Sequence, residues 1–317
     1  MMTSKWIIKA IIQKTISYLP WSDRINYFFQ KYVTGRVRLT DEYFGQKFQH
    51  ASEHCRVLQK YGQADPGNII LELGTGWYPI IPLWFFLSGS GRVFSVDIKQ
   101  WMTRETQHMT LLKMQEWRER GLLDNFVPDI DPECWDTMLD IVRDPETYDR
   151  DRVNSAIGLT PLLQDAGNLD MKDGSVDFIC SNNTFEHIPE SKLREILREF
   201  NRVLKPGGSM SHFIDLSDHF AHFDQRITIY NFLKFSDRQW KFLDNRIQPQ
   251  NRLRFTDYKK IYRETGISVT EEIVREGDPE QLKKVRIHSR FSGYTIHELA
   301  ISHGTIISQK QIPDNMV

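Results

Sequence analysis

From Asn68 onward, short apolar segments alternate with helical stretches, and this alternation limits the possible folds more than any other feature. The apolar segments are "NIILELG", "RVFSVDI", "VDFICSN", "SMSHFID" and, late in the chain, "LAISHGTIIS". Between the third and the fourth lies the amphipathic stretch "SKLREILREFNRVL". Strands that are joined through helices pair in parallel, because each crossover returns the chain to the start of the next strand. The sequence therefore predicts an α/β fold around a mostly parallel sheet.

The first sixty residues have helical periodicity instead. Residues 5–19 are predicted to form a helix whose apolar face carries Ile8, Ile11, Ile12, Ile16 and Leu19, with Lys9, Gln13, Lys14 and Ser17 on or near the other face. A second helix is expected after Ser22. A third is expected from Thr40 to Gly62, with a core stripe of Phe44, Phe48, Ala51, Cys55 and Leu58. We therefore divide the chain into an N-terminal helical extension, residues 1–62, and a main domain, residues 63–317.

One segment of the main domain breaks the alternation. Residues 117–160 mix tryptophans and prolines with many charges, and no strand pattern is visible in them. We interpret them as helical turns and loops inserted at one edge of the sheet.

Composition excludes several classes of protein. The chain has 41 lysines and arginines against 42 aspartates and glutamates, so no bulk positive field favours nucleic acid. The 3 cysteines stand far apart and form neither a disulfide framework nor a zinc pattern, which favours the cytoplasm. The longest apolar run, "IIPLWFFL", is too short to cross a bilayer. The basic helix at residues 5–19 has two interpretations, a lid over the main pocket, which we favour, or a peripheral contact with a membrane surface.

Two glycines follow the first predicted strand, in "LELGTG". Gly74 and Gly76 allow a sharp turn and let the backbone N–H groups approach a ligand closely. A dinucleotide site needs a third glycine three residues after the second, and that position is Pro79. The turn is therefore better suited to a smaller nucleoside than to a pyrophosphate.

Acidic residues end the next two predicted strands. Asp97 ends "RVFSVD", where a carboxylate can accept hydrogen bonds from both hydroxyls of a ribose. Asp165 stands where the third strand is expected to end, and its carboxylate could accept a hydrogen bond from the exocyclic amine of adenine. The glycine turn and these two acids together indicate a nucleoside site.

The ordered segments "LELGTG", "VD", "QDAGNLD", "DGSVDFICSNNTFEHI" and "LKPGG" resemble class I S-adenosylmethionine-dependent methyltransferases of the type 11 kind. The resemblance covers roughly residues 65–215. It implies a Rossmann-like, seven-stranded, mostly parallel sheet, methyltransferase activity and S-adenosyl-L-methionine as the cofactor. It assigns to the methionine part Glu72, Gly74 and Gly76, to the ribose Asp97, to adenine Asp165 and Ala166, and to the sulfonium end Ser181 and Asn182. Thr75 and Ile98 are further expected cofactor-binding residues. The third glycine that the family commonly carries is Tyr78 here.

Two histidine-containing segments are candidates for the chemistry. A hydroxyl acceptor needs its proton removed, and histidine is the natural base at neutral pH. His187 follows the fourth strand, and "HFIDLSDHFAHFD" follows the fifth. From the second segment we select His219, His222 and Asp218 as catalytic candidates, with Asp215 as an alternative carboxylate.

The candidate segments also raise the question of a metal. The pair Glu186 and His187 resembles the metal-binding pair of quinone-pathway O-methyltransferases, but Asn183 replaces the spaced acid of those enzymes. His219 and His222 with Asp215 or Asp218 offer a second possible ligand set. The expectation is that no metal is held.

The stretch that follows is rich in aromatic residues and contains Arg252 and Arg254. These residues can line an acceptor pocket. Alternatively, the aromatic residues pack in the core and the arginines lie on the surface. Together with the N-terminal helices, this stretch resembles uncharacterised methyltransferases of bacterial cell-surface polysaccharide gene clusters, which implies a sugar or glycolipid acceptor. The prediction is O-methylation of a small molecule or a sugar hydroxyl. Three alternatives stay open: N- or C-methylation, a nicotinamide-dependent oxidoreductase, and a non-catalytic cofactor-binding partner.

Overall fold

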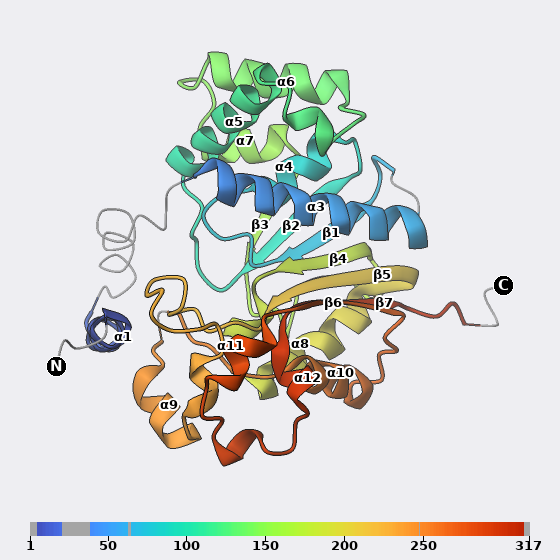
Figure 1. Cartoon of the computed structure of the whole chain (residues 1–317). Helices are drawn as coiled ribbons and strands as arrows, with labels where there is room; N and C mark the ends of the chain where they lie inside the picture. The colour runs from blue at the N-terminus through green and yellow to red at the C-terminus, as the bar shows by residue number, and fades with distance from the viewer. Residues whose placement is uncertain (1–4, 21–38, 63–64, 247, 314–317) are drawn as a thin grey trace.

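The computed structural model describes residues 5–20, 39–62, 65–246 and 248–313. These residues build one mixed sheet with helices on both faces (Figure 1). The strand order is β3-β2-β1-β4-β5-β7-β6. The strands are β1 (Ile69–Leu73), β2 (Arg92–Asp97), β3 (Leu159–Leu163), β4 (Val176–Asn182), β5 (Leu204–Asp215), β6 (Glu271–Glu276) and β7 (Ile301–Gln309). The predicted Rossmann-like, seven-stranded, mostly parallel sheet is confirmed.

The strands β1 to β5 are parallel, whereas β7 runs antiparallel to both β5 and β6. Strand β6, "EEIVRE", is almost wholly exposed. Its sequence is mostly charged and does not have the long apolar run by which the other strands are recognised. It is paired only along β7 and forms one edge of the sheet.

The strand order reverses around β1, which pairs with β2 on one side and with β4 on the other. Leu73, the last residue of β1, lies opposite Val96 of β2 and Ser181 of β4. The loops that leave these three strands therefore emerge side by side. In open α/β sheets this point is where ligands bind.

One face of the sheet is covered by helices that include the N-terminal helix α3 (Asp41–Tyr61). Thr40 caps its first turn, and the predicted stripe from Phe44 to Leu58 is buried against α4, β4 and β5. The expected helix from Thr40 to Gly62 is confirmed. The same face carries α4 (Ile80–Leu87), α5 (Arg104–Glu119), η1 (Leu123–Asn125), α6 (Pro132–Arg143) and α7 (Arg150–Ala156).

The inserted segment, residues 117–160, is mainly helical, as expected. Asp131 caps α6, with Pro132 in its first turn, and the helix packs against α5 and α4. Helix α7 packs on the edge strand β3. Figure 1 shows α5, α6 and α7 gathered at one end of the molecule, beyond β3.

The opposite face is covered by α8 (Glu190–Val203) and α10 (Phe255–Glu264), whose apolar side chains form one core with the sheet. The smaller elements are η2 (Phe185–His187), η3 (Asn231–Lys234), α9 (Asp237–Leu243), α11 (Pro279–Lys283), η4 (Ser289–Phe291) and α12 (Ile296–Ala300).

Helix α1 (Lys5–Ile16) forms as predicted, but the face that it buries is not the predicted one. The side chains of Lys9 and Gln13 are buried, while Ile8 and Ile11 are exposed. The reason is Trp6, whose ring centroid lies 5.6 Å from that of Phe220 and thereby sets the rotation of the helix.

The role of this extension stays a prediction, whether as a lid or as a membrane contact. The helix expected after Ser22 lies outside the described residues. None of the helices that the structure describes is long and apolar enough to cross a membrane.

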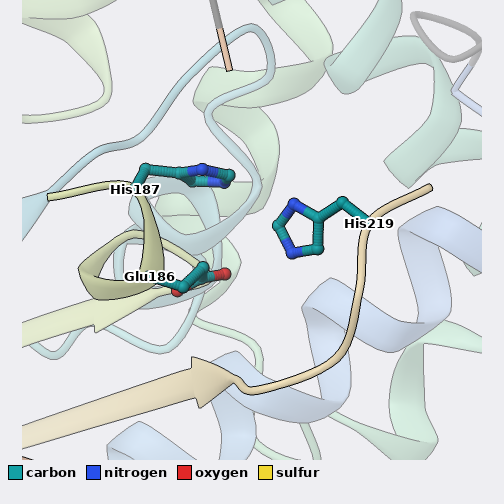
Figure 2. Close-up of side chains that lie close together, drawn as sticks. All are labelled: Glu186, His187 and His219. Carbon is teal, nitrogen blue, oxygen red and sulfur yellow. The ribbon is translucent and has the colours of Figure 1, made fainter. Parts of the chain in front are cut away.

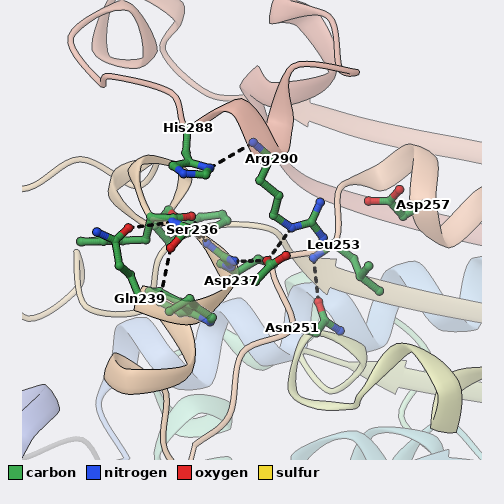
Figure 3. A network of polar contacts seen from close by, with 12 residues as sticks. Ser236, Asp237, Gln239, Asn251, Leu253, Asp257, His288 and Arg290 are labelled. Carbon is green, nitrogen blue, oxygen red and sulfur yellow. Dashed lines mark hydrogen bonds and ion pairs between the residues drawn. The ribbon is translucent and has the colours of Figure 1, made fainter.

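Arg252 and Arg254 brace the region after β5 instead of lining an acceptor pocket. The fully buried guanidinium of Arg254 donates to the carbonyl oxygens of Leu216 at 2.8 Å and Leu299 at 3.2 Å. Arg252 donates to the carboxylate of Asp237 at 2.6 Å. Asp237 also accepts from Arg290, in the polar network that Figure 3 shows. Both arginines are buried and satisfy acceptors of the protein, so the alternative interpretation, that they lie on the surface, is wrong.

Candidate active site

The glycine turn after β1 is held in the left-handed region of backbone conformation. Gly74 has a φ of +81°, its N–H donates to the Val96 carbonyl at 2.9 Å, and an added Cβ would lie 2.5 Å from Thr184 Oγ1. Gly76 has a φ of +73°, and a Cβ there would meet nothing within 4 Å. Gly74 is thus required by the protein itself, whereas Gly76 borders open space.

Thr75 and Glu72 tie this turn to the sheet. The Thr75 hydroxyl donates to the carboxylate of Glu72 and accepts from Ser95 Oγ at 2.6 Å. Glu72 is buried, and this burial raises the pKa of its carboxyl group to about 7. The turn therefore rests on a buried acid that is ready to change its protonation state near neutral pH.

Asp97 faces the glycine turn from the end of β2. Its Oδ1 accepts from Trp101 Nε1 at 3.2 Å and lies 3.4 Å from the backbone nitrogen of Lys99, while the N–H of Gly76 also faces the carboxylate. Burial raises the pKa of Asp97. A pocket of about 200 Å³ opens beside it, lined by residues that include Thr75, Gly76, Ser95, Asp97, Trp101 and Asn154.

The residues assigned to adenine, Asp165 and Ala166, and the cofactor candidate Ile98 differ in exposure. Ile98 is 76% exposed, which is unusual for an isoleucine that directly follows a buried strand. Ala166 is buried. The Asp165 carboxylate accepts from the Gly167 N–H at 2.8 Å and pairs with Lys192 at 2.6 Å, which holds the pKa of Asp165 below its ordinary value.

The two residues assigned to the sulfonium end of the cofactor point in different directions. The Ser181 hydroxyl is buried against His212 Nδ1 at 2.8 Å, and His212 packs under α8 and α10. The side chain of Asn182 instead faces His50 of α3. Only Asn182 therefore presents its side chain toward the strand-end crevice, on the side of the sheet that α3 covers.

Helix α3 contributes site residues that the sequence interpretation missed. Its Lys47 Nζ lies 3.4 Å from the Asn182 carbonyl and faces Glu72 and Glu186. Its His50 ring stacks on Phe213 of β5 at 3.9 Å between centroids, and burial lowers the pKa of His50 to about 4. A signal was present, because a second helical stripe runs beside the apolar one, made of Tyr43, Lys47, His50 and His54.

The end of β4 places Glu186 and His187 at the rim of the crevice. Asn183 adopts a φ of +53°, a conformation that asparagine tolerates better than most residues, and the chain turns sharply into η2. His187 Nδ1 donates to the Pro249 carbonyl at 2.6 Å, which leaves Nε2 as the unprotonated nitrogen. Burial lowers the pKa of His187 to about 4, so the ring is neutral.

The loop after β5 brings two more histidines to the same place. The ring centroids of His187 and His219 are 5.0 Å apart, and those of His219 and His222 are 6.0 Å apart. Asp215 contacts two of these histidines. Its Oδ2 lies 3.4 Å from His219 Nε2 and 3.6 Å from His222 Nε2. His303 of β7 approaches the other oxygen at 3.6 Å.

Asp218, our catalytic candidate, has different contacts. Its buried carboxylate accepts from the Asn231 side chain at 2.9 Å and from the Phe220 N–H at 2.8 Å. These bonds hold the loop in shape. Asp215, and not Asp218, lies beside the histidines. The loop turns back after the strand, so residues three apart along it point in different directions.

The pocket beside Asp97 suits a nucleoside cofactor. Gly76 leaves open space where a side chain would otherwise stand, and the buried Asp97 carboxylate offers a hydrogen-bond acceptor for hydroxyl groups. Of the predicted cofactor residues, Thr75, Gly76 and Asp97 line this pocket, together with Trp101.

Comparison with known proteins agrees with this geometry. A sequence model of the family described as "Methyltransferase domain" matches residues 133–211, from α6 to β5, a stretch that includes Asp165 and His187. No curated protein matches the sequence.

Several solved structures are similar to this chain at low identity. One is a candidate sarcosine dimethylglycine methyltransferase from Galdieria sulphuraria, with 15% identity and a TM-score of 0.49, covering 90% of this chain and 97% of that one. Another is geranyl diphosphate C-methyltransferase from Streptomyces coelicolor A3(2), with 12% identity and a TM-score of 0.44, covering 82% and 79%. A third is an S-adenosylmethionine-dependent methyltransferase from Methanosarcina mazei, with 14% identity and a TM-score of 0.42, covering 81% and 97%.

The sheet order, the glycine turn facing Asp97 and the family match over residues 133–211 support an S-adenosylmethionine-dependent methyltransferase with the class I fold. Its cofactor is S-adenosyl-L-methionine, and its activity is methyl transfer.

Proposed function

We propose that this enzyme methylates a hydroxyl group of a small molecule or a sugar, with a histidine as the general base. One observation carries the proposal: His219 and His222 from the loop after β5 flank the carboxylate of Asp215, and His187 from the turn after β4 lies against His219. A nitrogen acceptor that is already neutral needs no such base, whereas a hydroxyl must lose its proton as it attacks.

One set of residues would hold the cofactor, and another would remove the proton of the acceptor hydroxyl. Gly74, Gly76 and Asp97 would hold the cofactor, which supplies an electrophilic methyl group when bound. Orientation of the two reactants can account for about 7–11 kcal/mol of the barrier. The base adds roughly 10²–10⁴-fold in rate.

His222 is the histidine best placed to accept the proton. Its Nε2 lies 3.6 Å from the Asp215 carboxylate, which orients the ring, and its side chain is 48% exposed, so the proton can pass to solvent. His187 and His219 lie deeper, around Glu186. The polar side chains of Asn182, His50 and Asp215 near the strand ends would suit an acceptor with several hydrogen-bonding groups, as a sugar has.

The test uses S-adenosylmethionine labelled with ¹³C in the methyl group. The purified enzyme is incubated with fractionated small metabolites and with sugar nucleotides, and the product is analysed by NMR, because the methyl chemical shift separates oxygen, nitrogen and carbon acceptors. An O-methyl product supports the proposal, and a product methylated only on nitrogen or carbon contradicts it.

The base is tested separately with His222→Gln. The variant should lower kcat by roughly 10²–10⁴-fold while cofactor affinity is kept. His297→Gln is the matched control, because His297 is an exposed histidine paired with an acid, Glu276, at 3.3 Å. Equal rates for the two variants would show that His222 is not the base.

A further inference from the structure

Glu186, His187 and His219 form a cluster at the rim of the crevice in which one potential ligand atom from each lies within 4.8 Å of the others. Figure 2 shows that Glu186 and His187 come from the turn after β4 and that His219 reaches them from the loop after β5. No family motif spans these two segments. The spaced acid that would accompany Glu186 and His187 is replaced by Asn183. The fold instead brings His219 beside these two residues.

The state of Glu186 is the second observation. Its side chain is 2% exposed, and among the residues that the structure describes only the backbone N–H groups of Glu186 and Asp215 face the carboxylate, with no side chain donating to it. A buried carboxylate to which no side chain donates is costly, and such groups are normally paired or coordinate a metal. Lys47 faces Glu186 but makes no hydrogen bond with it. The buried carboxylate therefore indicates a binding site for a cation.

The two histidines are oriented from behind, as metal ligands usually are. His187 is held by the Pro249 carbonyl through Nδ1, at 2.6 Å, so that Nε2 is free to coordinate. His219 Nε2 lies 3.4 Å from the Asp215 carboxylate, which orients the ring. A carbonyl or carboxylate behind a ligating imidazole sets its tautomer and strengthens it as a ligand.

We infer that Glu186, His187 and His219 bind a divalent transition-metal ion of the Zn²⁺ type. Two imidazoles and one carboxylate suit Zn²⁺ and its first-row neighbours, whereas Mg²⁺ and Ca²⁺ prefer ligand sets made wholly of oxygen. Three protein ligands leave a coordination position open, which the oxygen of an acceptor can occupy. This role of the open position rests on the proposed function, but metal binding itself does not.

The role is compatible with the assignment of His222 as the base. His222 is not in the ligand set, and it shares Asp215 with His219. A metal ion would lower the pKa of a coordinated hydroxyl, and His222 would take the released proton. The sequence analysis considered Glu186 with His187 and, separately, His219 with His222, whereas the structure places His219 beside Glu186 and His187.

The experiment measures metal binding directly and needs no acceptor. The full chain is freed of metal with a chelator, and Co²⁺ is titrated while the visible absorption is recorded; bound Zn²⁺ is counted in parallel by mass spectrometry. We expect one ion per chain. Glu186→Gln and His219→Asn should each weaken binding at least tenfold, and Asp215→Asn by about 10–100-fold.

The matched control is the double variant Glu276→Gln and His297→Ala, which removes an exposed acid–histidine pair and should bind metal as the parent does. Calorimetry with S-adenosylmethionine on each variant shows that it is folded. A parent chain that takes up no more metal than the combined Glu186→Gln and His219→Asn variant would overturn the inference. Metal binding without an O-methyl product would instead refute the proposed function alone.

Discussion

The indole Nε1 of Trp101 donates a hydrogen bond to Asp97 Oδ1 at 3.2 Å, and the Trp101 ring lies 4.9 Å from that of Trp77, next to the glycine turn. The carboxylate expected to receive the ribose is therefore already engaged by a side chain on its own loop. Because a carboxylate can accept several hydrogen bonds, Trp101 can either orient Asp97 or give way to the cofactor.

Substitution of these two residues separates their contributions. Asp97→Ala should weaken the binding of S-adenosylmethionine and of its demethylated product by roughly 10–150-fold, because hydrogen bonds to a charged group are worth about 1.5–3 kcal/mol. Trp101→Phe keeps an aromatic ring but removes the donor, so affinity should change by less than about fivefold. Calorimetry with both ligands measures the effect, and unchanged affinity in Asp97→Ala would exclude Asp97 as the ribose ligand.

The two glycines of the turn should respond differently to the same substitution. Both have positive φ, so alanine costs roughly 1 kcal/mol of strain at either position. Only at Gly74 does the new methyl group also collide with Thr184, 2.5 Å away.

Gly74→Ala should therefore lower the melting temperature clearly, whereas Gly76→Ala should leave it within a few degrees and weaken cofactor binding instead, because its methyl group enters the open space. Thermal unfolding and calorimetry on both variants test this. Equal loss of stability in the two variants would show that the turn is not supported by Thr184.

The protonation of Glu72 should make the stability of the enzyme depend on pH. Its pKa is raised by burial from 4.5 to about 7, so the folded state holds this proton more tightly than the unfolded chain does. Stability then falls as the pH rises from about 4.5 to about 7 and stays reduced above it, by on the order of 1–3 kcal/mol.

Glu72→Gln should remove this part of the pH dependence. Without cofactor, the variant should lose less free energy of unfolding than the parent between roughly pH 5 and pH 8. Glu146→Gln is the control, because the Glu146 side chain is 91% exposed. Parallel stability curves for the parent and Glu72→Gln would contradict the assignment.

Much of the cofactor end of the site could be predicted, because its signals are local. A strand, a glycine pair and a following acid are close together in the sequence, and parallel pairing of β1 with β2 brings Gly76 and Asp97 face to face whatever the rest of the chain does. The helix stripe from Phe44 to Leu58 was equally local. Helix α1 was oriented wrongly because its own isoleucine pattern was overruled by one tertiary contact, that of Trp6 with Phe220.

The sequence by itself determined the α/β fold, the parallel order of the main strands and the nucleoside pocket, because hydrophobic periodicity and turn chemistry act over a few residues. Only the tertiary structure decided which side chains complete the site. It selected Asp215 over Asp218, added Lys47 and His50 from α3, and placed His219 beside Glu186 and His187. These pairs are far apart along the chain, so their proximity depends on how whole helices and loops pack, which no local pattern records.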